Sequence, residues 1–424
     1  MKRSARATHT AYERPYRPLP LRVANTALGL AWRSVQRRPP LDETALFEIA
    51  ERATGLLDPG EPDFRAPLRT LLRSIESEAR LHPIGRLITR HRLATTLATR
   101  MRITERFRRD PSLADQRIGA PIVIAGLQRT GTTLLHRLLA SDARRLRALA
   151  SWEALDPVPP EVRENETDPR LASAEVAESG LRYMAPDFFA VHPVEARAPE
   201  EDVLLLDLSF RSTVPEATLR VPSFSRWLED QDQLPAYRML ERCLQLLEPR
   251  TANGGKPRRW VLKTPHHLEW LDVLFSVFPD ALVVWPHRDP VQTVPSFCSM
   301  VAHGRGVFSD DVDPREVGSE WSRKVARMLD RGMSAREAAG DKRFVDVAYS
   351  ELVRDPISVV RRIYQRADIP YSREAESAMR DLLRTQTQHK HGVHRYDAAD
   401  FGLSDDGIRN QLAAYRARFA PFFS

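Results

Sequence analysis

The chain of 424 residues contains only two cysteines, Cys243 and Cys298. Two thiols cannot form a disulfide framework or a cysteine-rich metal site, and they suit a reducing compartment. No run of about 18 apolar residues occurs, which argues against a membrane-spanning helix. The first twenty residues carry charges throughout and lack the apolar stretch of a signal peptide. We therefore expect a cytoplasmic protein without a membrane span.

Lysine is also scarce, since only six of the 64 basic residues are lysines. Arginine is common everywhere in the chain, so an arginine patch says little, whereas a well-placed lysine is informative. The net charge of +7 suits anionic small molecules or acidic acceptors. The basic residues form no single block, and no zinc-finger, homeodomain or RNA-binding motif is present, so nucleic acid is not an expected partner.

Hydrophobic periodicity divides the chain into three parts. Residues 1–20 predict a disordered basic tail, because prolines stand there in a polar context. Residues 21–115 predict a helical region packed on the rest, because apolar residues recur at three- and four-residue steps. From 120 to 424, short apolar strands alternate with helices, which predicts an α/β fold: a P-loop-like three-layer sandwich with a central parallel sheet. Two segments, 155–200 and 302–315, are expected to be loops over the active face.

The segment 121–135 combines an apolar strand, a glycine turn and a helix with leucines at helical spacing. This is the layout of a phosphate-binding loop. Gly126 and Gly131 have the spacing of that loop and let the backbone curl around an anion. The free N–H groups of the loop and of the first helical turn then point at the anion.

The loop differs from that of a nucleotide triphosphatase in one position. Thr132 stands where the lysine is required, although Thr133 fills the final place, and the cation lies earlier, at Arg129. A triphosphatase uses that lysine on the β- and γ-phosphates. Its absence argues against ATP or GTP hydrolysis. It favours an anionic cofactor held by Arg129, two threonine hydroxyls and backbone amides.

Two further strands end in polar residues. The strand predicted at 281–285 is followed by Arg288, with Ser296 eight residues later in the next helix. An arginine at a strand end and a hydroxyl on the adjoining helix can form a second anion pocket. Pairing with Asp289 is an alternative explanation of the arginine, and the pattern alone does not decide between them.

The strand at 260–262 ends at Lys263, one of the rare lysines, and His266 and His267 follow in the first turn of a helix. Lysine can neutralise charge on a transferring group, and histidine is the commonest general base near neutral pH. Glu153 is either a further general base or an acid that caps a helix. No cluster of His, Cys, Asp and Glu has metal-ligand spacing, so no metal is expected.

Together these motifs resemble the sulfotransferase superfamily that uses 3′-phosphoadenosine 5′-phosphosulfate (PAPS), and in particular its bacterial family proteins. Residues 126–133 are similar to the family's 5′-phosphosulfate loop, and Arg288 with Ser296 is similar to its 3′-phosphate site. Tyr349 is similar to a tyrosine near the nucleotide, and residues 390–396 match the family's C-terminal loop only loosely. The resemblance implies that the nucleotide is bound by Gln128, Arg129, Thr130, Gly131, Thr132, Thr133, Arg288, Ser296 and Tyr349.

The resemblance also implies a reaction. A sulfuryl group would pass from PAPS, without a metal, to a hydroxyl or amine of a small-molecule, carbohydrate or lipid acceptor by in-line attack. His267 or His266, with Glu153 in reserve, would take the acceptor proton. Arg129 and Lys263 would neutralise charge on the leaving phosphate.

Two alternatives stay open at this point. A P-loop kinase acting on a small molecule would need Mg²⁺ and the lysine that is missing at position 132. A non-catalytic nucleotide-binding protein on the same fold would have no need of Lys263 or of the two histidines.

Overall fold

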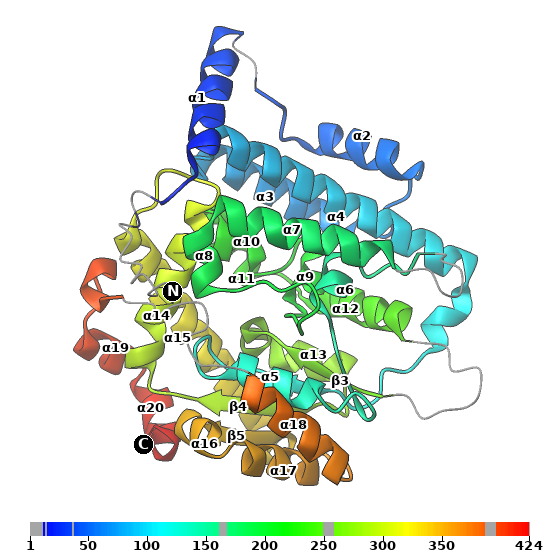
Figure 1. Ribbon diagram of the computed structural model, residues 1–424, viewed down its shortest axis with the longest axis vertical. Helices are drawn as coiled ribbons and strands as arrows, with labels where there is room; N and C mark the ends of the chain where they lie inside the picture. The colour runs from blue at the N-terminus through cyan, green and yellow to red at the C-terminus, as the bar shows by residue number, and fades with distance from the viewer. Residues whose placement is uncertain are drawn as a thin grey trace, which may run out of the picture.

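The computed structural model describes Tyr12 and residues 15–35, 38–160, 168–248, 258–385 and 396–423. Its body is a sheet of five parallel strands in the order β2-β3-β1-β4-β5, enclosed by helices (Figure 1). The strands are β1 (Ile122–Ile124), β2 (Leu146–Ala148), β3 (Arg259–Lys263), β4 (Leu282–His287) and β5 (Phe344–Ala348). This confirms the predicted α/β fold with a central parallel sheet.

Helices cover both faces of the sheet, so the body has three layers. The side chains of β1 alternate between the faces: Ile122 and Ile124 belong to one buried cluster and Val123 to the other. The first cluster contains residues of α5 (Thr132–Ala140), α17 (Pro356–Arg366) and α18 (Arg373–Thr385). The second contains residues of α12 (Leu234–Leu247), α13 (Leu271–Val277), α14 (Pro290–Gly306) and α15 (Pro314–Ala339). Because successive side chains of β1 point to opposite faces of the sheet, this one strand contributes to the packing of both helical layers.

The helical N-terminal region has a core of its own. It contains α1 (Leu19–Ser34), α2 (Glu43–Thr54), α3 (Arg65–Glu78) and α4 (Pro83–Arg109). Asp42 caps α2 by accepting a hydrogen bond from the backbone N–H of Ala45, and Gly55 ends the helix in the left-handed conformation. Leucines of α2, α3 and α4 share a buried cluster with Phe210 and Phe224 from the body, which docks the region onto the sandwich.

The expectation of loops is only partly right, because both segments contain helices, whereas residues 307–313 form no helix. Residues 155–200 contain α7 (Pro169–Met184) and α8 (Pro186–Val191), α14 continues through Gly306, and α15 begins at Pro314. Each of these helices begins at a proline, where the missing N–H has no helical partner to lose. The other short α-helices are α6 (Ser151–Leu155), α9 (Val203–Asp207), α10 (Val214–Thr218), α11 (Pro222–Glu229), α16 (Tyr349–Arg354), α19 (Asp405–Gln411) and α20 (Ala413–Phe419).

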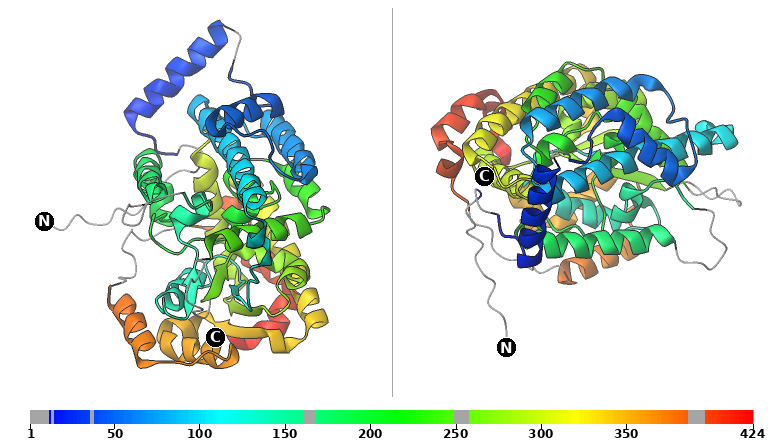
Figure 2. Two further views of the ribbon diagram at one scale, coloured as in Figure 1. Left: turned by 90° about the vertical axis from the view of Figure 1, so that its right-hand side faces the viewer. Right: turned by 90° about the horizontal axis from the view of Figure 1, so that it is seen from above.

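Part of the predicted disordered tail is held by the body. The Tyr12 hydroxyl lies 2.7 Å from Ser299 Oγ in a buried contact. Arg17 donates to the backbone carbonyl oxygens of Gly306 at 2.6 Å and Ser309 at 3.0 Å. Tyr12 and Arg17 thus have fixed contacts with the body, which a tail disordered over all of residues 1–20 would lack. Residues 1–11, 13 and 14 of that tail lie outside the described residues. From residue 19 the chain forms α1, which projects from the body (Figure 2).

Two helical glycines offer a matched test of the packing. A Cβ at Gly318 in α15 would lie 2.1 Å from the backbone oxygen of Phe401, whereas a Cβ at Gly180 in α7 would meet nothing within 4 Å. We expect Gly318→Ala to lower the free energy of unfolding by about 1–3 kcal/mol through overpacking. We expect Gly180→Ala to raise it by up to about 1 kcal/mol, because alanine favours the helix. Thermal unfolding followed by circular dichroism should show shifts of opposite sign, and equal shifts would contradict this packing.

Candidate active site

The loop between β1 and α5 needs glycine at two positions. Gly131 has a φ of +88°, and a Cβ there would lie 2.8 Å from Leu352 Cδ2. A Cβ at Gly126 would lie 2.9 Å from Pro286 Cδ and 3.0 Å from Pro286 O. Arg129 also has a positive φ, +69°, which turns the backbone sharply in the middle of the loop. Close approach of neighbouring chain segments and left-handed backbone together shape this loop.

The loop leads into the N-terminus of α5, which carries a partial positive charge. No described side chain caps this end, and its first turn contains no acidic residue. Thr130 is buried and donates from Oγ1 to Leu127 O at 2.6 Å, so its hydroxyl stabilises the loop itself. Thr133 is exposed, Thr132 is buried beside it, and Gln128 is half-buried in the same loop. The free N–H groups and the Thr133 hydroxyl are therefore available to an anion.

Four of the predicted nucleotide-binding residues come together beside this loop. Arg129 Nε lies 3.1 Å from Ser296 Oγ, so the loop arginine reaches the hydroxyl on α14. Arg288 Nη1 donates to Arg129 O at 3.0 Å, and its guanidinium lies 4.2 Å from the centre of the Tyr349 ring. The alternative pairing is absent for Arg288, because Asp289 instead caps α14 and pairs with Arg416 at 3.0 Å. Two arginines, a hydroxyl and an aromatic ring thus gather next to the glycine loop.

The C-terminal loop that the resemblance suggested is only partly visible. Residues 390–395 of that segment lie outside the described residues. Tyr396 is described, and its hydroxyl donates to Gln292 O at 3.1 Å. Because Gln292 Oε1 also accepts from Arg288 Nε at 3.0 Å, Tyr396 reaches the same edge of the site.

A buried network anchors the strand end that carries Arg288. His287, the last residue of β4, places Nδ1 2.8 Å from the Tyr415 hydroxyl and Nε2 2.8 Å from Asp346 Oδ1. Arg336 binds both oxygens of Asp346, at 2.7 and 2.9 Å. Burial opposes ionisation, but the hydrogen bonds from His287 and Arg336 outweigh it and lower the pKa of Asp346 to about 2. The charged carboxylate therefore holds the end of β4 and positions the residue that follows.

The end of β3 presents Lys263 next to the loop. Lys263 pairs in register with Ile124 of β1, and the loop begins two residues after Ile124. The Lys263 Nζ lies 2.7 Å from Glu201 Oε1, and the other Glu201 oxygen accepts from Thr264 Oγ1 at 3.2 Å. The side chain of Glu201 keeps 21% of its surface exposed, against 4% for Lys263. This carboxylate is therefore the solvent-accessible member of the pair.

The two predicted histidines are enclosed behind the lysine. His267 Nδ1 lies 2.9 Å from the Tyr237 hydroxyl, and Nε2 lies 2.8 Å from Asp202 Oδ2, with the whole residue buried. Burial raises the pKa of Tyr237 well above its usual value, so the phenol keeps its proton and donates it to Nδ1. His266 is buried too, and burial followed by the neighbouring His267 holds its pKa well below the usual value. Neither imidazole faces solvent.

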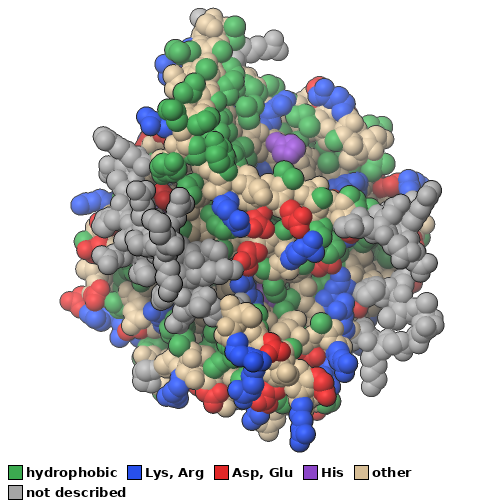
Figure 3. Space-filling view, viewed as in Figure 1, with side chains coloured by type: hydrophobic (Ala, Val, Ile, Leu, Met, Phe, Trp, Pro, Cys, Tyr) green, Lys and Arg blue, Asp and Glu red, His purple; other side chains and the backbone are tan. Residues whose placement is uncertain are grey.

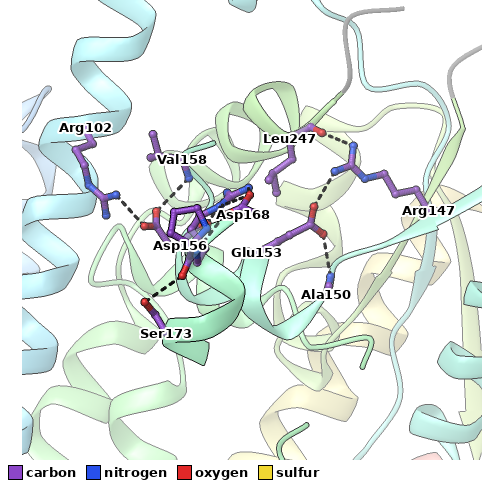
Figure 4. Close-up of polar contacts among 11 residues, drawn as sticks. Arg102, Arg147, Ala150, Glu153, Asp156, Val158, Asp168, Ser173 and Leu247 are labelled. Carbon is purple, nitrogen blue, oxygen red and sulfur yellow. Dashed lines mark hydrogen bonds and ion pairs between the residues drawn. The ribbon is translucent and has the colours of Figure 1, made fainter. Parts of the chain in front are cut away.

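Glu153 is held by structural contacts on α6. Its Oε1 accepts from Arg147 Nη2 at 2.9 Å, and its Oε2 accepts from the backbone N–H of Ala150 at 3.1 Å (Figure 4). The second contact caps the first turn of α6. Arg147 also donates to Leu247 O. Of the two roles that the sequence allowed for Glu153, general base or helix cap, these contacts favour the helix cap.

On the other side of α6 lies an apolar groove of about 970 Å³ between α4, α6, α7 and α9. An ion pair of 2.7 Å between Arg102 and Asp156 spans it (Figure 4). Leu204 on α9 lines the groove and follows Glu201 by three residues, so the groove lies close in sequence to the carboxylate that pairs with Lys263. Its apolar lining includes Leu56, Ile88, Trp152, Ala154, Leu155, Val158, Pro159, Leu204 and Val214.

Three site residues escaped the sequence reasoning. Glu201 and Asp202 contact Lys263 across 62 and 61 residues of chain, respectively, Asp202 through a 2.7 Å hydrogen bond from the Lys263 backbone N–H. The run of three acids at 200–202 after a proline was the available signal. His136 on α5 is fully buried; burial, then the charge of Lys263, lowers its pKa to about 3. It resembled an ordinary helix residue in sequence.

Within the described ranges, no group of three or more His, Cys, Asp or Glu side chains is placed to hold a metal ion. Among the helices of the described chain, none is both long and apolar enough to cross a membrane.

Comparison with known proteins gives a consistent result. A family model described as the sulfotransferase family matches residues 121–373. A curated protein of Mycobacterium bovis, omega-hydroxy-beta-dihydromenaquinone-9 sulfotransferase Stf3, is 29% identical over 260 residues. That alignment covers 58% of this chain and 62% of the relative, so the chain matches under two thirds of its length.

Solved structures agree over most of the chain. The sulfotransferase STF1 of Mycobacterium tuberculosis superposes with a TM-score of 0.78 at 32% identity, covering 89% of this chain and 100% of that one. The sulfotransferase STF9 of Mycobacterium avium superposes with a TM-score of 0.80 at 28% identity, covering 90% and 97%.

The buried His136 generates a pH prediction. Its folded pKa of about 3 lies below the unfolded value of about 6.5, so protonation favours the unfolded chain. The stability that depends on a neutral His136 is complete above pH 6.5 or so and is lost as the pH falls towards 3. Urea unfolding should show the unsubstituted protein losing up to about 1.4 kcal/mol more per pH unit below about 6.5 than His136→Gln. A constant difference between the two proteins across that range would show that His136 is not held neutral.

Proposed function

The chain belongs to the sulfotransferase family, and on this basis we propose that it is an enzyme that moves a sulfuryl group from PAPS to the hydroxyl or amine of a small-molecule or lipid acceptor. One observation carries the proposal. The glycine loop and the cluster of Arg129, Ser296 and Arg288 form two adjacent anion cradles on one sheet edge. A donor with phosphate groups at both ends of its nucleoside fits this pair of cradles.

The residues present fit such a donor. The 5′-phosphosulfate would be held by the loop, where a Cβ at Gly126 or Gly131 would collide with neighbouring chain segments. The 3′-phosphate would be held by Arg288 and Ser296, with Arg129 between the two cradles and Tyr349 beside the nucleotide. A kinase reading is disfavoured because Thr132 occupies the lysine position.

Fixed positive groups supply the charge compensation that the transfer needs. Lys263 ends the strand beside the loop, Arg129 stands within the loop, and Thr132 and Thr133 begin the helix whose free N–H groups follow it. These groups would neutralise charge that grows on the phosphate as the sulfuryl group leaves. Because they are held by neighbouring contacts, they need little reorganisation during the reaction.

We assign the removal of the acceptor proton to Glu201. Among the candidate bases it combines a position beside Lys263 with a carboxylate that solvent and acceptor can reach. His266 and His267 are enclosed, so we propose that neither accepts the proton and that His267 positions the strand end through Asp202. Glu153 remains the reserve candidate, and its contacts with Arg147 and Ala150 favour a capping role.

The groove beside α6 would bind the acceptor. Its lining is mainly apolar, with charged residues at intervals, as expected for an amphiphile with a polar end near Glu201. The name of the Mycobacterium bovis relative, which specifies a hydroxylated menaquinone, supports a hydroxyl-bearing lipid as the acceptor class.

The donor assignment can be tested by calorimetry with 3′-phosphoadenosine 5′-phosphate in EDTA. We expect metal-independent binding that prefers this nucleotide to ATP and 5′-AMP. Arg288→Ala should weaken it by about 30-fold or more, since a charged hydrogen bond contributes about 2 kcal/mol. Arg117→Ala is the matched control, because Arg117 pairs with Asp280 at the amino ends of the strands, away from the site. If ATP bound more tightly than 3′-phosphoadenosine 5′-phosphate and required magnesium, the result would contradict the sulfotransferase proposal and favour a kinase.

If Glu201 is the general base, its substitution should lower turnover without weakening nucleotide binding. With labelled PAPS and a terminally hydroxylated polyprenyl quinol, Glu201→Gln should lower kcat by about 10²- to 10⁴-fold and leave nucleotide binding nearly unchanged. Glu153→Gln serves as the comparison and should mainly reduce thermal stability, because it loses a cap and an ion pair. A folded Glu153→Gln protein without turnover, beside an active Glu201→Gln protein, would transfer the role to Glu153. Full turnover after substitution of Lys263 would show that catalysis does not depend on this strand end.

A further inference from the structure

The first helix of the chain is unusually exposed. None of the 16 residues of α1, all of which the structure describes, is buried. Leu19, Val23 and Leu30 keep 67%, 59% and 61% of their surface exposed. Exposure of several large aliphatic side chains on one helix is unfavourable in water, because each loses the stabilisation that burial would give. The helix therefore has the composition of an element that is covered when the protein functions.

The exposed apolar residues form one stripe. Leu19, Val23, Ala27 and Leu30 follow each other at steps of four, four and three residues, which places them on one side of the helix. Val35, just beyond the helix, is a further exposed aliphatic residue, with 66% of its surface exposed. Figure 3 shows hydrophobic side chains along the projecting α1, with basic side chains at its margins.

The other side of the helix holds it to the body by few contacts. Asn25 Oδ1 accepts from the backbone N–H of Ile84 at 2.9 Å, and a Cβ at Gly29 would lie 3.7 Å from Pro83. A groove of about 710 Å³ separates much of α1 from α3 and the start of α4. The helix is thus positioned but not packed, and it projects beyond the body (Figure 2). Leu30 lines this groove, but it and the other large residues of the stripe keep most of their surface exposed and accessible from outside the chain.

Basic residues dominate this end of the sequence. The first 41 residues contain nine basic residues and a single acidic one, Glu13. Arg22 and Arg33, both exposed, stand on α1 itself, which has no acidic residue. A helix with an apolar face, arginines at its margins and no acids has the pattern of helices that lie in the interface of an anionic membrane.

We propose that α1 is an interfacial helix that docks this protein on an anionic lipid surface, with its apolar stripe in the acyl boundary and its arginines at the headgroups. A second copy of the chain is a poorer occupant. Packing two such helices on a twofold axis would place the arginines of one against those of the other, with no carboxylate on either helix to offset them.

The position of α1 near the apolar groove suggests what docking on a membrane would achieve. The helix contacts the first turn of α4 at Pro83 and Ile84, and the apolar groove beside α6 starts on the same helix at Ile88. A membrane bound along α1 therefore lies close to the mouth of that groove, where a lipid could enter without crossing water. The docking itself does not depend on the proposed sulfuryl transfer and can be measured without any activity.

The test is flotation of the full chain with vesicles of phosphatidylcholine, alone or with about 30% phosphatidylglycerol. We expect binding to the anionic vesicles and little to the neutral ones. The triple substitution Leu19→Ser, Val23→Ser and Leu30→Ser should reduce binding to anionic vesicles by more than about 10-fold. Arg22→Gln with Arg33→Gln should reduce it by about fivefold for each arginine, and high salt should have the same direction of effect.

The matched control is Leu57→Ser with Val176→Ser, which removes two aliphatic side chains of 75% and 73% exposure elsewhere on the surface and should leave binding unchanged. Because no residue of α1 is buried, all variants should keep the unfolding temperature of the parent protein. Equal binding to both kinds of vesicle, or unchanged binding of the triple variant, would overturn the proposal. A parent dimer that the triple substitution converts to a monomer in light scattering, without lipid binding by either, would show that α1 contacts a second copy instead.

Discussion

The parallel pairing of β3, β1 and β4 is the constraint on which the site depends. Ile124 of β1 lies opposite Lys263 on one side and Val284 on the other, so the three strands end at the same edge of the sheet. Neighbouring strands are about 4.8 Å apart, which brings the segments that follow them within reach of a single small molecule. The glycine loop, the lysine and the arginine of the second cradle have no other reason to meet, since long helical segments separate them in sequence.

A concentration of cations at one edge needs compensation when no anion is bound. Glu201 supplies it for Lys263, and Asp202 holds the strand end beneath through His267 and the Lys263 backbone N–H. Breaking a buried charge pair by removing one partner is strongly unfavourable. On the proposed function, an anionic donor bound beside Lys263 would take over part of this compensation and weaken the contact between Glu201 and the lysine. The Glu201 carboxylate would then be more available to an acceptor.

Local sequence patterns predicted the sheet, its glycine loop and the cluster around Arg288, because each rests on residues at fixed short spacing. Patterns could not predict Glu201, whose role arises from a contact 62 residues away. They also misplaced helices as loops, because proline was taken to end structure where it begins α7, α8 and α15. The anchoring of β4 by Tyr415 likewise depends on tertiary packing 128 residues further along the chain. Parts of the site formed by residues close in sequence could be predicted, whereas contacts between residues far apart in sequence could not.

The N-terminal helices connect the site with the outside of the molecule. α4 runs from the base of the exposed α1 to the wall of the apolar groove, and its Arg102 pairs with Asp156 across that groove. An acceptor with a long apolar part is sparingly soluble, so its route to the site matters as much as its fit within it. The proposed lipid-binding helix contacts one end of α4, and the groove starts one turn further along the same helix. A lipid acceptor would therefore have a short route from the membrane to the groove. On the proposed function, the sandwich then has only to present its charged edge near this groove, since Leu204 in the groove lining follows Glu201 by three residues.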